Sequence, residues 1–269
     1  MRIVGRRPDG YHLLQTVFRL LDWGDEIRLR VREGAGVIVR VHGSDTIDAE
    51  DDLAVRAARA LQHETGTRLG ADIAVDKRIP LGAGLGGGSS DAATVLLALN
   101  ALWKTELSRD RLTKIGLSLG ADVPIFVHGR SAWAEGVGEK LTALQLPPRW
   151  YVILVPPVHV STAELFQAPE LTRNAAPATM TGFASDGIAD NAFEPVARSR
   201  YPQVAAALEW LGQFGLARLS GSGGAVFLEC GVEARAREIA TRCPAEFTVF
   251  VARGLDISPL DRALARYQN

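Results

Sequence analysis

A glycine-rich segment, Leu81 to Asp91, constrains this chain more than any other part of its sequence. Five of the seven residues after Leu81 are glycines, so the backbone can adopt positive φ angles and pass close to a ligand. The apolar run from Ala92 to Trp103 predicts a helix directly behind the segment, and Ser89, Ser90 and Asp91 suit its first position. Because unpaired N–H groups and a partial positive charge at a helix start attract anions, the segment predicts a polyphosphate site.

The spacing of the segment excludes two common nucleotide-binding motifs. A Walker loop needs a lysine after its last glycine, and two serines follow here instead. A dinucleotide fingerprint needs the G-x-G-x-x-G spacing after a strand, which Gly84, Gly86 and Gly87 do not provide, and Pro80 interrupts the approach. The glycines alone also fit a loop that only passes tightly from a strand to a helix, and the segment by itself leaves this alternative open.

The composition limits which kinds of binding partner and which cellular compartment are expected. The formal charge is -1 across 269 residues, and the lysines and arginines are scattered, so we expect no nucleic-acid partner. No apolar run approaches the length of a membrane span, and we expect no membrane partner. Cys230 and Cys243 are too far apart for a C-x-x-C site and suggest free thiols in a reducing compartment. We therefore expect a cytoplasmic protein.

Helix and strand patterns alternate along the chain and predict an α+β protein. Alternating charged and apolar residues predict strands at 26–32 and 36–42, joined as a hairpin at 33–35. Further strands are expected at 71–79, 131–134, 140–144, 151–155, 225–229 and 248–252. Further helices are expected at 52–65, 109–119 (capped by Ser108 and ended by Gly120), 162–166, 194–198, 203–214 and 232–241.

Pro147 and Pro148 mark the best internal boundary, because a proline pair suits a linker and a new strand pattern begins behind it. The prediction is therefore two lobes, an N-terminal ATP-binding lobe at 1–147 and a C-terminal substrate-side lobe at 148–269. The assignment of roles to the lobes rests on the motifs that follow.

A second glycine cluster, Leu219 to Ala225, lies between a predicted helix and a predicted strand. Two such loops far apart in the sequence suggest one cleft between two lobes, although this cluster alone also fits a plain connection. In the segment from Gly120 to Phe126, Asp122 stands among small and apolar residues. A carboxylate in such surroundings costs stability unless it is paired, so we expect a functional role, with a hydrogen bond to the turn as the alternative.

These three segments resemble the three motifs of the GHMP kinases, a superfamily of ATP-dependent small-molecule phosphotransferases, in order, spacing and residues. Four further segments narrow the resemblance to the branch whose substrate is a methylerythritol carrying a cytidine diphosphate group, phosphorylated at its 2-hydroxyl in isoprenoid precursor synthesis. They are Arg7 to Thr16, Asp76 to Pro80, Asp186 to Phe193, and Gly254 to Leu260. The resemblance covers nearly the whole chain and implies a two-lobed α+β fold with the active site in the cleft between the lobes.

The resemblance implies that Asp122 is the catalytic base that accepts the proton of the 2-hydroxyl, with ATP and Mg²⁺ as cofactors. Positioning and charge stabilisation by the glycine-rich segment then supply most of the catalysis, because the transition state of phosphoryl transfer is loose. The residues implied to bind ATP are Lys77, Pro80, Leu81, Gly82, Ala83, Gly84, Leu85, Gly86, Gly87, Gly88, Ser89 and Ser90. Lys77 on its own also fits a solvated lysine at a strand end.

On the substrate side, the resemblance implies that Tyr11 stacks on the cytosine, that His12 hydrogen bonds the base edge, and that Phe166 closes the other face. Thr162 is expected to touch the substrate, and Gly221 and Gly223 are also expected to bind it. Without the resemblance, the two aromatic residues also fit an ordinary core. We expect a monomer or weak homodimer whose partner is a small molecule with a cytidine diphosphate group.

Two alternatives stay open at this point. The first is a sister kinase of the mevalonate, homoserine or galactose type, and the second is a nucleotide-binding protein without catalysis. The second alternative rests on one difference between this chain and the family pattern. The family has an N-terminal strand with a Pro-x-Lys-x-Asn pattern, and Met1 to Gly5 aligns just past that strand. No lysine therefore precedes Lys77 in this chain. We therefore expect this chain, as written, to fold less stably and to phosphorylate poorly compared with one extended upstream.

Overall fold

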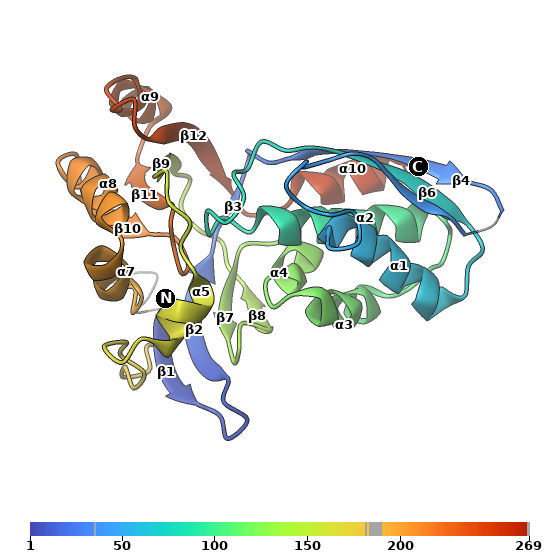
Figure 1. The fold of residues 1–269 in the computed structure, drawn as a ribbon, viewed down its shortest axis with the longest axis horizontal. Coiled ribbons are helices and arrows are strands. Elements are labelled where there is room, and N and C mark those ends of the chain that lie inside the picture. The colour runs from blue at the N-terminus through green and yellow to red at the C-terminus, as the bar shows by residue number, and fades with distance from the viewer. Residues whose placement is uncertain (35, 181, 183–189, 268–269) are drawn as a thin grey trace. The chain divides into compact units, whose positions relative to one another are not determined.

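The computed structural model describes residues 1–34, 36–180, 182 and 190–267, and Figure 1 shows its fold. The chain divides into two compact units, each assembled from three stretches of sequence. Unit 1 consists of residues 1–23, 82–85 and 131–256, and unit 2 of residues 24–81, 86–130 and 257–269. This grouping differs from the single cut at residue 147, and the expected domains 1–147 and 148–269 stay a prediction.

The described residues of unit 2 form a three-stranded sheet and five helices. Its strands are β4 (Glu26–Arg32), β5 (Ile38–His42) and β6 (Gly70–Asp76), and its helices are α1 (Leu53–Thr65), α2 (Gly87–Leu102), α3 (Arg109–Leu119), α4 (Val123–His128) and α10 (Pro259–Tyr267). Figure 1 shows α1 and α2 packed along this sheet, and their facing sides bury the core of the unit. Its largest fully buried side chains are Leu61, Ile73, Leu96, Leu99 and Leu112.

The hairpin expected at 26–42 is wrong. The strand order is β4-β6-β5, so β6 lies between the two strands that were expected to pair. β4 runs antiparallel to β6 and β5 runs parallel to it. Period-two alternation showed that each strand has one buried face, but it carries no information about which strand lies beside it.

Local capping chemistry explains the helix boundaries that were predicted correctly. Asp52 accepts a hydrogen bond from the Ala54 amide at 2.9 Å at the start of α1, and Gly66 ends that helix in the left-handed conformation. Ser108 caps α3 in the same way, through the Arg111 amide, and α3 ends before Gly120. Both helices have the expected bounds to within one residue.

Helix α2 begins earlier than expected. Gly86 is its N-cap residue in a left-handed conformation, and the Ser90 amide donates to the Gly86 carbonyl at 2.8 Å. Ser89 and Ser90 therefore lie in the first turn, Asp91 follows directly after it, and none of the three caps the helix. The glycines are used as the first residues of the helix itself, which places the hydroxyl groups one turn deeper than the sequence suggested.

Unit 1 contains two sheets. One has the order β1-β2-β7-β8 and the other β10-β11-β9-β12-β3, with β9 antiparallel to both of its neighbours. The strands are β1 (Arg2–Arg6), β2 (His12–Phe18), β3 (Leu20–Leu21), β7 (Ala132–Glu135), β8 (Lys140–Ala143), β9 (Trp150–Val155), β10 (Ala217–Leu219), β11 (Val226–Cys230) and β12 (Thr248–Leu255). The helices are α5 (Thr162–Gln167), α7 (Glu194–Arg200), α8 (Pro202–Gly212) and α9 (Glu233–Thr241). The core between sheet and helices includes Ile3, Leu154, Leu165, Phe193 and Leu208, all at most 2% exposed.

The α+β class is confirmed, and the predicted strands and helices of both units are present within a few residues of their expected bounds, the strand expected at 71–79 ending three residues earlier, at Asp76. Strands β1, β2, β3 and β10 and helices α4 and α10 had no sequence prediction. Of the segment Asp186 to Phe193 that carried part of the resemblance, residues 186–189 lie outside the described residues. Among the described helices, none combines the length and apolar character needed to cross a membrane.

Candidate active site

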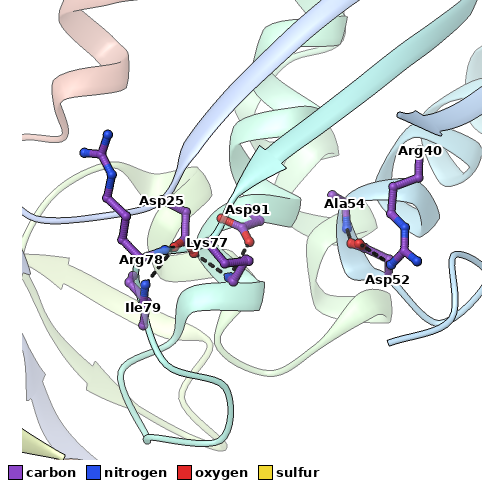
Figure 2. Close-up of polar contacts among 8 residues, drawn as sticks. All are labelled: Asp25, Arg40, Asp52, Ala54, Lys77, Arg78, Ile79 and Asp91. Carbon is purple, nitrogen blue, oxygen red and sulfur yellow. Dashed lines mark hydrogen bonds and ion pairs between the residues drawn. The ribbon is translucent and has the colours of Figure 1, made fainter. Parts of the chain in front are cut away.

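Residues 77–91, called the glycine loop below, connect the end of β6 to the first turn of α2. Lys77 lies at the start of the loop, and its ammonium group contacts two carboxylates, those of Asp25 and Asp91 (Figure 2). The bond to Asp91 measures 2.8 Å. The Asp25 side chain is 1% exposed and that of Asp91 is 8% exposed, so this ion-pair cluster is buried. It joins the first residue of the loop to the last.

The ionisation of this cluster is set by burial. Desolvation raises the pKa of Asp91 to about 7, against the opposing effect of Lys77 and with a further increase from the neighbouring Asp25. Burial alone lowers the pKa of Lys77, but its bonds to Asp25 and Asp91 outweigh burial and raise it. Lys77 was expected to bind the nucleotide, and its charge is already engaged by two carboxylates.

The glycines of the loop adopt conformations that other residues avoid. Gly82, Gly84 and Gly86 have φ angles of +67°, +71° and +70°. A Cβ on Gly86 would lie 2.8 Å from Cζ of Phe126 in α4. Glycine is required there both by the backbone angle and by the close approach of the aromatic ring. The segment is therefore built as a close-fitting backbone turn, as expected for a phosphate cradle.

Within unit 1, the second glycine cluster packs directly on residues 82–85. Ser220 Oγ donates to the Gly84 carbonyl at 3.0 Å, and the Ala225 amide donates to the Ala83 carbonyl at 2.9 Å. A Cβ on Gly84 would lie 2.3 Å from the Gly223 carbonyl oxygen. The two glycine clusters that were distant in sequence are thus in backbone contact, and neither tolerates a larger residue at this point.

Asn191 holds the second glycine cluster from behind. Its side-chain amide donates to the carbonyls of Leu219 at 3.0 Å and Gly221 at 2.8 Å, and its oxygen accepts from the Phe193 amide. The residue is 7% exposed, so these bonds are shielded from water. The resemblance of the segment around Asn191 was the only sequence signal for this role.

Asp122 precedes α4 and carries no capping hydrogen bond. Among the residues that the structure describes, none forms a hydrogen bond or ion pair with its carboxylate. The side chain is exposed at the surface, yet the protein around the carboxylate removes enough water to raise its pKa above the usual aspartate range. A Cβ on Gly120 would lie 4.0 Å from Ser89 Oγ, so the segment before Asp122 lies beside the first turn of α2. An accessible carboxylate with a raised pKa and no protein partner is suited to accept a proton.

An aromatic group in unit 1 surrounds His12. The His12 ring stacks on Phe166 with centroids 4.9 Å apart, and Phe166 meets the buried Phe193 edge-on at 4.8 Å. His12 Nε2 is buried and has no hydrogen-bond partner among the described residues. Burial lowers the pKa of His12, and the charges of Arg173 and Arg6 lower it further, which keeps the ring neutral near pH 7. A buried polar atom left unpaired beside stacked rings fits the polar edge of a heteroaromatic ligand.

The remaining predicted substrate residues lie in the same unit. Tyr11 is 64% exposed, and it is His12 that lies against Phe166. Thr162 Oγ1 and Ser222 Oγ are 2.6 Å apart, which joins the start of α5 to the second glycine cluster that contains Gly221 and Gly223. The assigned contacts of these residues with substrate stay predictions.

Two residues at the site were missed from the sequence. Asp25 receives hydrogen bonds from the amides of Arg78 and Ile79 at 2.6 Å and 2.8 Å. Arg173 donates to the carbonyls of Phe166 and Ala168, both at 2.8 Å, and to a third carbonyl at 3.1 Å. Asp25 binds the backbone of a segment more than fifty residues away and Arg173 binds carbonyls within seven residues of itself, and no sequence motif predicts either set of bonds.

The described residues do not form a metal site from side chains alone. Within the described part of the chain, no group of three or more His, Cys, Asp or Glu side chains is arranged to hold one. Mg²⁺ usually keeps several waters and binds through substrate phosphates, so a protein cage is not needed. The hydroxyl groups of Ser89 and Ser90 in the first turn of α2 are suitable additional ligands.

Comparison with known proteins gives two family matches. Residues 52–130 match the GHMP kinases N terminal domain, and residues 172–249 match the GHMP kinases C terminal domain. The chain is 54% identical over 97% of its length to a protein of Aromatoleum aromaticum named 4-diphosphocytidyl-2-C-methyl-D-erythritol kinase, covering 91% of it. A protein of the same name from Xanthomonas campestris pv. campestris is 55% identical over the whole chain, which covers 91% of that protein.

Comparison with solved structures gives a match of the same kind. A crystal structure of 4-(cytidine 5'-diphospho)-2C-methyl-D-erythritol kinase matches with a TM-score of 0.78 at 35% identity, covering 94% of each chain. The mevalonate kinase of Methanococcus jannaschii matches with a TM-score of 0.63 at 14% identity, covering 93% of this chain and 100% of the other. At that identity the second match shows a shared fold only.

Proposed function

The chain belongs to the 4-diphosphocytidyl-2-C-methyl-D-erythritol kinase family of the GHMP kinases, and on that premise we propose how its own residues carry out phosphoryl transfer. As a member of this family it is an ATP-dependent phosphotransferase with an alcohol acceptor and a small-molecule substrate. The proposed reaction transfers the γ-phosphoryl group of ATP to the 2-hydroxyl of 4-diphosphocytidyl-2-C-methyl-D-erythritol. The sister kinases of the mevalonate and homoserine type are not favoured, because their matches share only the fold.

The observation that carries the mechanism is the state of Asp122. An alcohol is a weak nucleophile, so a carboxylate within hydrogen-bond reach is needed to take its proton. Asp122 is accessible and has no partner among the described residues. Its raised pKa makes its carboxylate a stronger proton acceptor than an ordinary aspartate. As the substrate oxygen bonds to the γ-phosphorus, the bond from that phosphorus to the β,γ-bridging oxygen breaks. ADP leaves, and the hydroxyl proton passes to Asp122.

The glycine loop is proposed to hold the triphosphate. Backbone amides at the start of α2 face outward with the positive end of the helix dipole, and glycine at 84 and 86 lets phosphate oxygens approach them closely. Ser89 and Ser90 would hold Mg²⁺ together with the phosphates, and the bound ion would supply positive charge to the transferred group. The residues expected from the resemblance to bind ATP, Lys77 and 80–90, keep this role as a proposal.

The cytosine is proposed to bind at His12 and Phe166. The unpaired His12 Nε2 would be satisfied by the base edge, and the neutral ring can act as donor or acceptor. Tyr11 is proposed to move over the exposed face of the base, with Thr162, Gly221 and Gly223 near the diphosphate. The substrate is then a small molecule with a cytidine diphosphate group, and we expect no nucleic-acid or membrane partner, a cytoplasmic location, and a monomer or weak homodimer.

The proposal is tested by measuring binding of cytidine monophosphate and phosphate transfer with the chain and its Asp122→Asn variant. The nucleotide should bind both proteins equally, because Asp122 and His12 lie in different units. Transfer should fall by about 10²- to 10⁴-fold in the variant. Full activity of Asp122→Asn would remove the base from the mechanism, and failure of cytidine monophosphate to bind would remove the cytosine site.

A further inference from the structure

We infer that Asp25 is a positioning residue for ATP, which fixes the glycine loop in its phosphate-binding conformation without touching the nucleotide. This inference rests on the proposed role of the loop. Asp25 carries no motif of its own and follows the short segment Asp22-Trp23-Gly24, so the role emerges only from the fold.

The register of the sheet places Asp25 beside the loop. β4 and β6 pair antiparallel with Glu26 opposite Asp76, so the residue before Glu26 lies opposite the residue after Asp76, which is Lys77. The end of this ladder is therefore the point at which the chain leaves the sheet and enters the glycine loop. A carboxylate placed there meets the backbone of the loop at its first turn.

The two carboxylate oxygens of Asp25 bond to different partners. Oδ1 accepts from the amides of Arg78 and Ile79 at 2.6 Å and 2.8 Å, and Oδ2 accepts from the ammonium of Lys77 (Figure 2). Charge-assisted bonds of this kind are stronger than neutral ones, and the side chain is only 1% exposed. Asp25 therefore fixes the direction in which residues 77–79 leave the sheet.

The same carboxylate also lies at the far end of the loop. A Cβ on Gly87, the first residue of α2, would lie 3.4 Å from Asp25 Oδ2 and 3.0 Å from Cγ2 of Ile79. Lys77, which is bonded to Asp25, also bonds Asp91 near the start of the helix. The two ends of the loop are thus joined through the chain of contacts Asp25, Lys77 and Asp91, which fixes both ends of the intervening glycine segment.

Holding the ends of a glycine-rich loop has a specific energetic effect. Glycine loses more conformational freedom on ordering than any other residue, so an untethered loop would have to be ordered when the nucleotide binds. A loop that is already ordered avoids that cost, and the gain appears in nucleotide affinity. A buried ion pair placed elsewhere in the unit contributes only to folding.

The chain contains such a control. Asp52 has a partly buried carboxylate, 15% exposed, that pairs with an arginine, Arg40 at 3.2 Å, and accepts a hydrogen bond from the backbone amide of Ala54 at 2.9 Å (Figure 2). It caps α1, and among the described residues its hydrogen bonds and ion pair involve none of residues 77–91. Asp25→Asn and Asp52→Asn therefore each remove one arginine- or lysine-paired carboxylate from the same unit, and only Asp25 bonds to the glycine loop.

The experiment measures ATP and cytidine monophosphate binding by calorimetry, with urea unfolding, for the chain and both variants. In Asp25→Asn the new amide group faces the Lys77 ammonium, so ATP should bind at least about tenfold more weakly. Cytidine monophosphate binding should stay within about twofold of the unaltered chain in both variants. Asp52→Asn should lose stability and keep its ATP affinity.

Four outcomes are decisive. Equal ATP affinity in Asp25→Asn and the unaltered chain, or equal weakening in both variants, overturns the positioning role. Absence of ATP binding in the unaltered chain overturns the proposed function instead. If Asp25→Asn does not fold, Asp25→Glu decides, because it keeps the charge but moves the oxygen away from the two amides; unchanged ATP affinity in that variant also refutes the inference.

Discussion

Replacing Asp91 by asparagine should remove a pH dependence of stability that this one carboxyl imposes. Burial raises the pKa of Asp91 from 3.8 to about 7 in the folded chain. A carboxyl that holds its proton more tightly when folded favours folding at low pH. That contribution is fully present below the unfolded pKa and is lost as the pH rises through about 7.

The size of the effect follows from the two pKa values. At about 1.4 kcal/mol for each pH unit, the interval from 3.8 to about 7 corresponds to about 4 kcal/mol in total. The neutral amide of Asp91→Asn has no such contribution to lose. Between about pH 5 and about pH 8, the free energy of unfolding of the unaltered chain should fall by about 3 kcal/mol relative to that of the variant.

Urea unfolding of both proteins across this pH range measures the difference, and subtracting the two curves cancels the other titrating groups. Asp72→Asn is a control, because bonds from Arg32 and Arg30 lower the pKa of Asp72 and place its titration below this range. The difference between that variant and the unaltered chain should stay flat from about pH 5 to about pH 8. A difference between the unaltered chain and Asp91→Asn that is constant, or that rises with pH, would refute the reasoning.

Three further predictions concern the site. Gly84→Ala should weaken ATP binding at least about tenfold, because its Cβ would meet the Gly223 carbonyl at 2.3 Å. Gly66→Ala, at a similar φ of +68° with open space around it, should cost about 1 kcal/mol of stability and leave ATP binding intact, as calorimetry and urea unfolding can check. Arg173→Gln loses bonds to three carbonyls and should weaken cytidine monophosphate binding about tenfold without affecting ATP; equal affinity would contradict this. The phosphorylation rate should fall as the pH is lowered through the raised pKa of Asp122, which must be unprotonated to act; a steady-state pH profile that is flat on its acid side would contradict that.

Features that depend on local chemistry were predictable from the sequence. Ser108 and Gly120 predicted the start and the end of α3, and apolar residues at helical spacing predicted α1. Asp122 was singled out because a lone acid among small and apolar residues has few structural reasons to be there, and its catalytic role stays a prediction. Each of these signals is contained in fewer than about ten residues of sequence.

Features that depend on the pairing of distant segments were not predictable. The hairpin at 26–42 failed because β6, about forty residues on, inserts between its two strands. Asp25 acquires its role from the same pairing, since only the register of β4 on β6 places it opposite Lys77. Helix α4 was missed because it is short, has Pro124 as its second residue, and has no side-chain cap.

The residues of the site together are proposed to phosphorylate one hydroxyl of a cytidine-diphosphate-linked substrate. The most direct test is phosphorus NMR of the product formed from ATP, Mg²⁺ and 4-diphosphocytidyl-2-C-methyl-D-erythritol, with Asp122→Asn as the parallel reaction. We predict a new phosphomonoester on the 2-hydroxyl, formed together with ADP, that the variant does not produce. Transfer to mevalonate or homoserine in place of this substrate, or no transfer dependent on Asp122, would contradict the account.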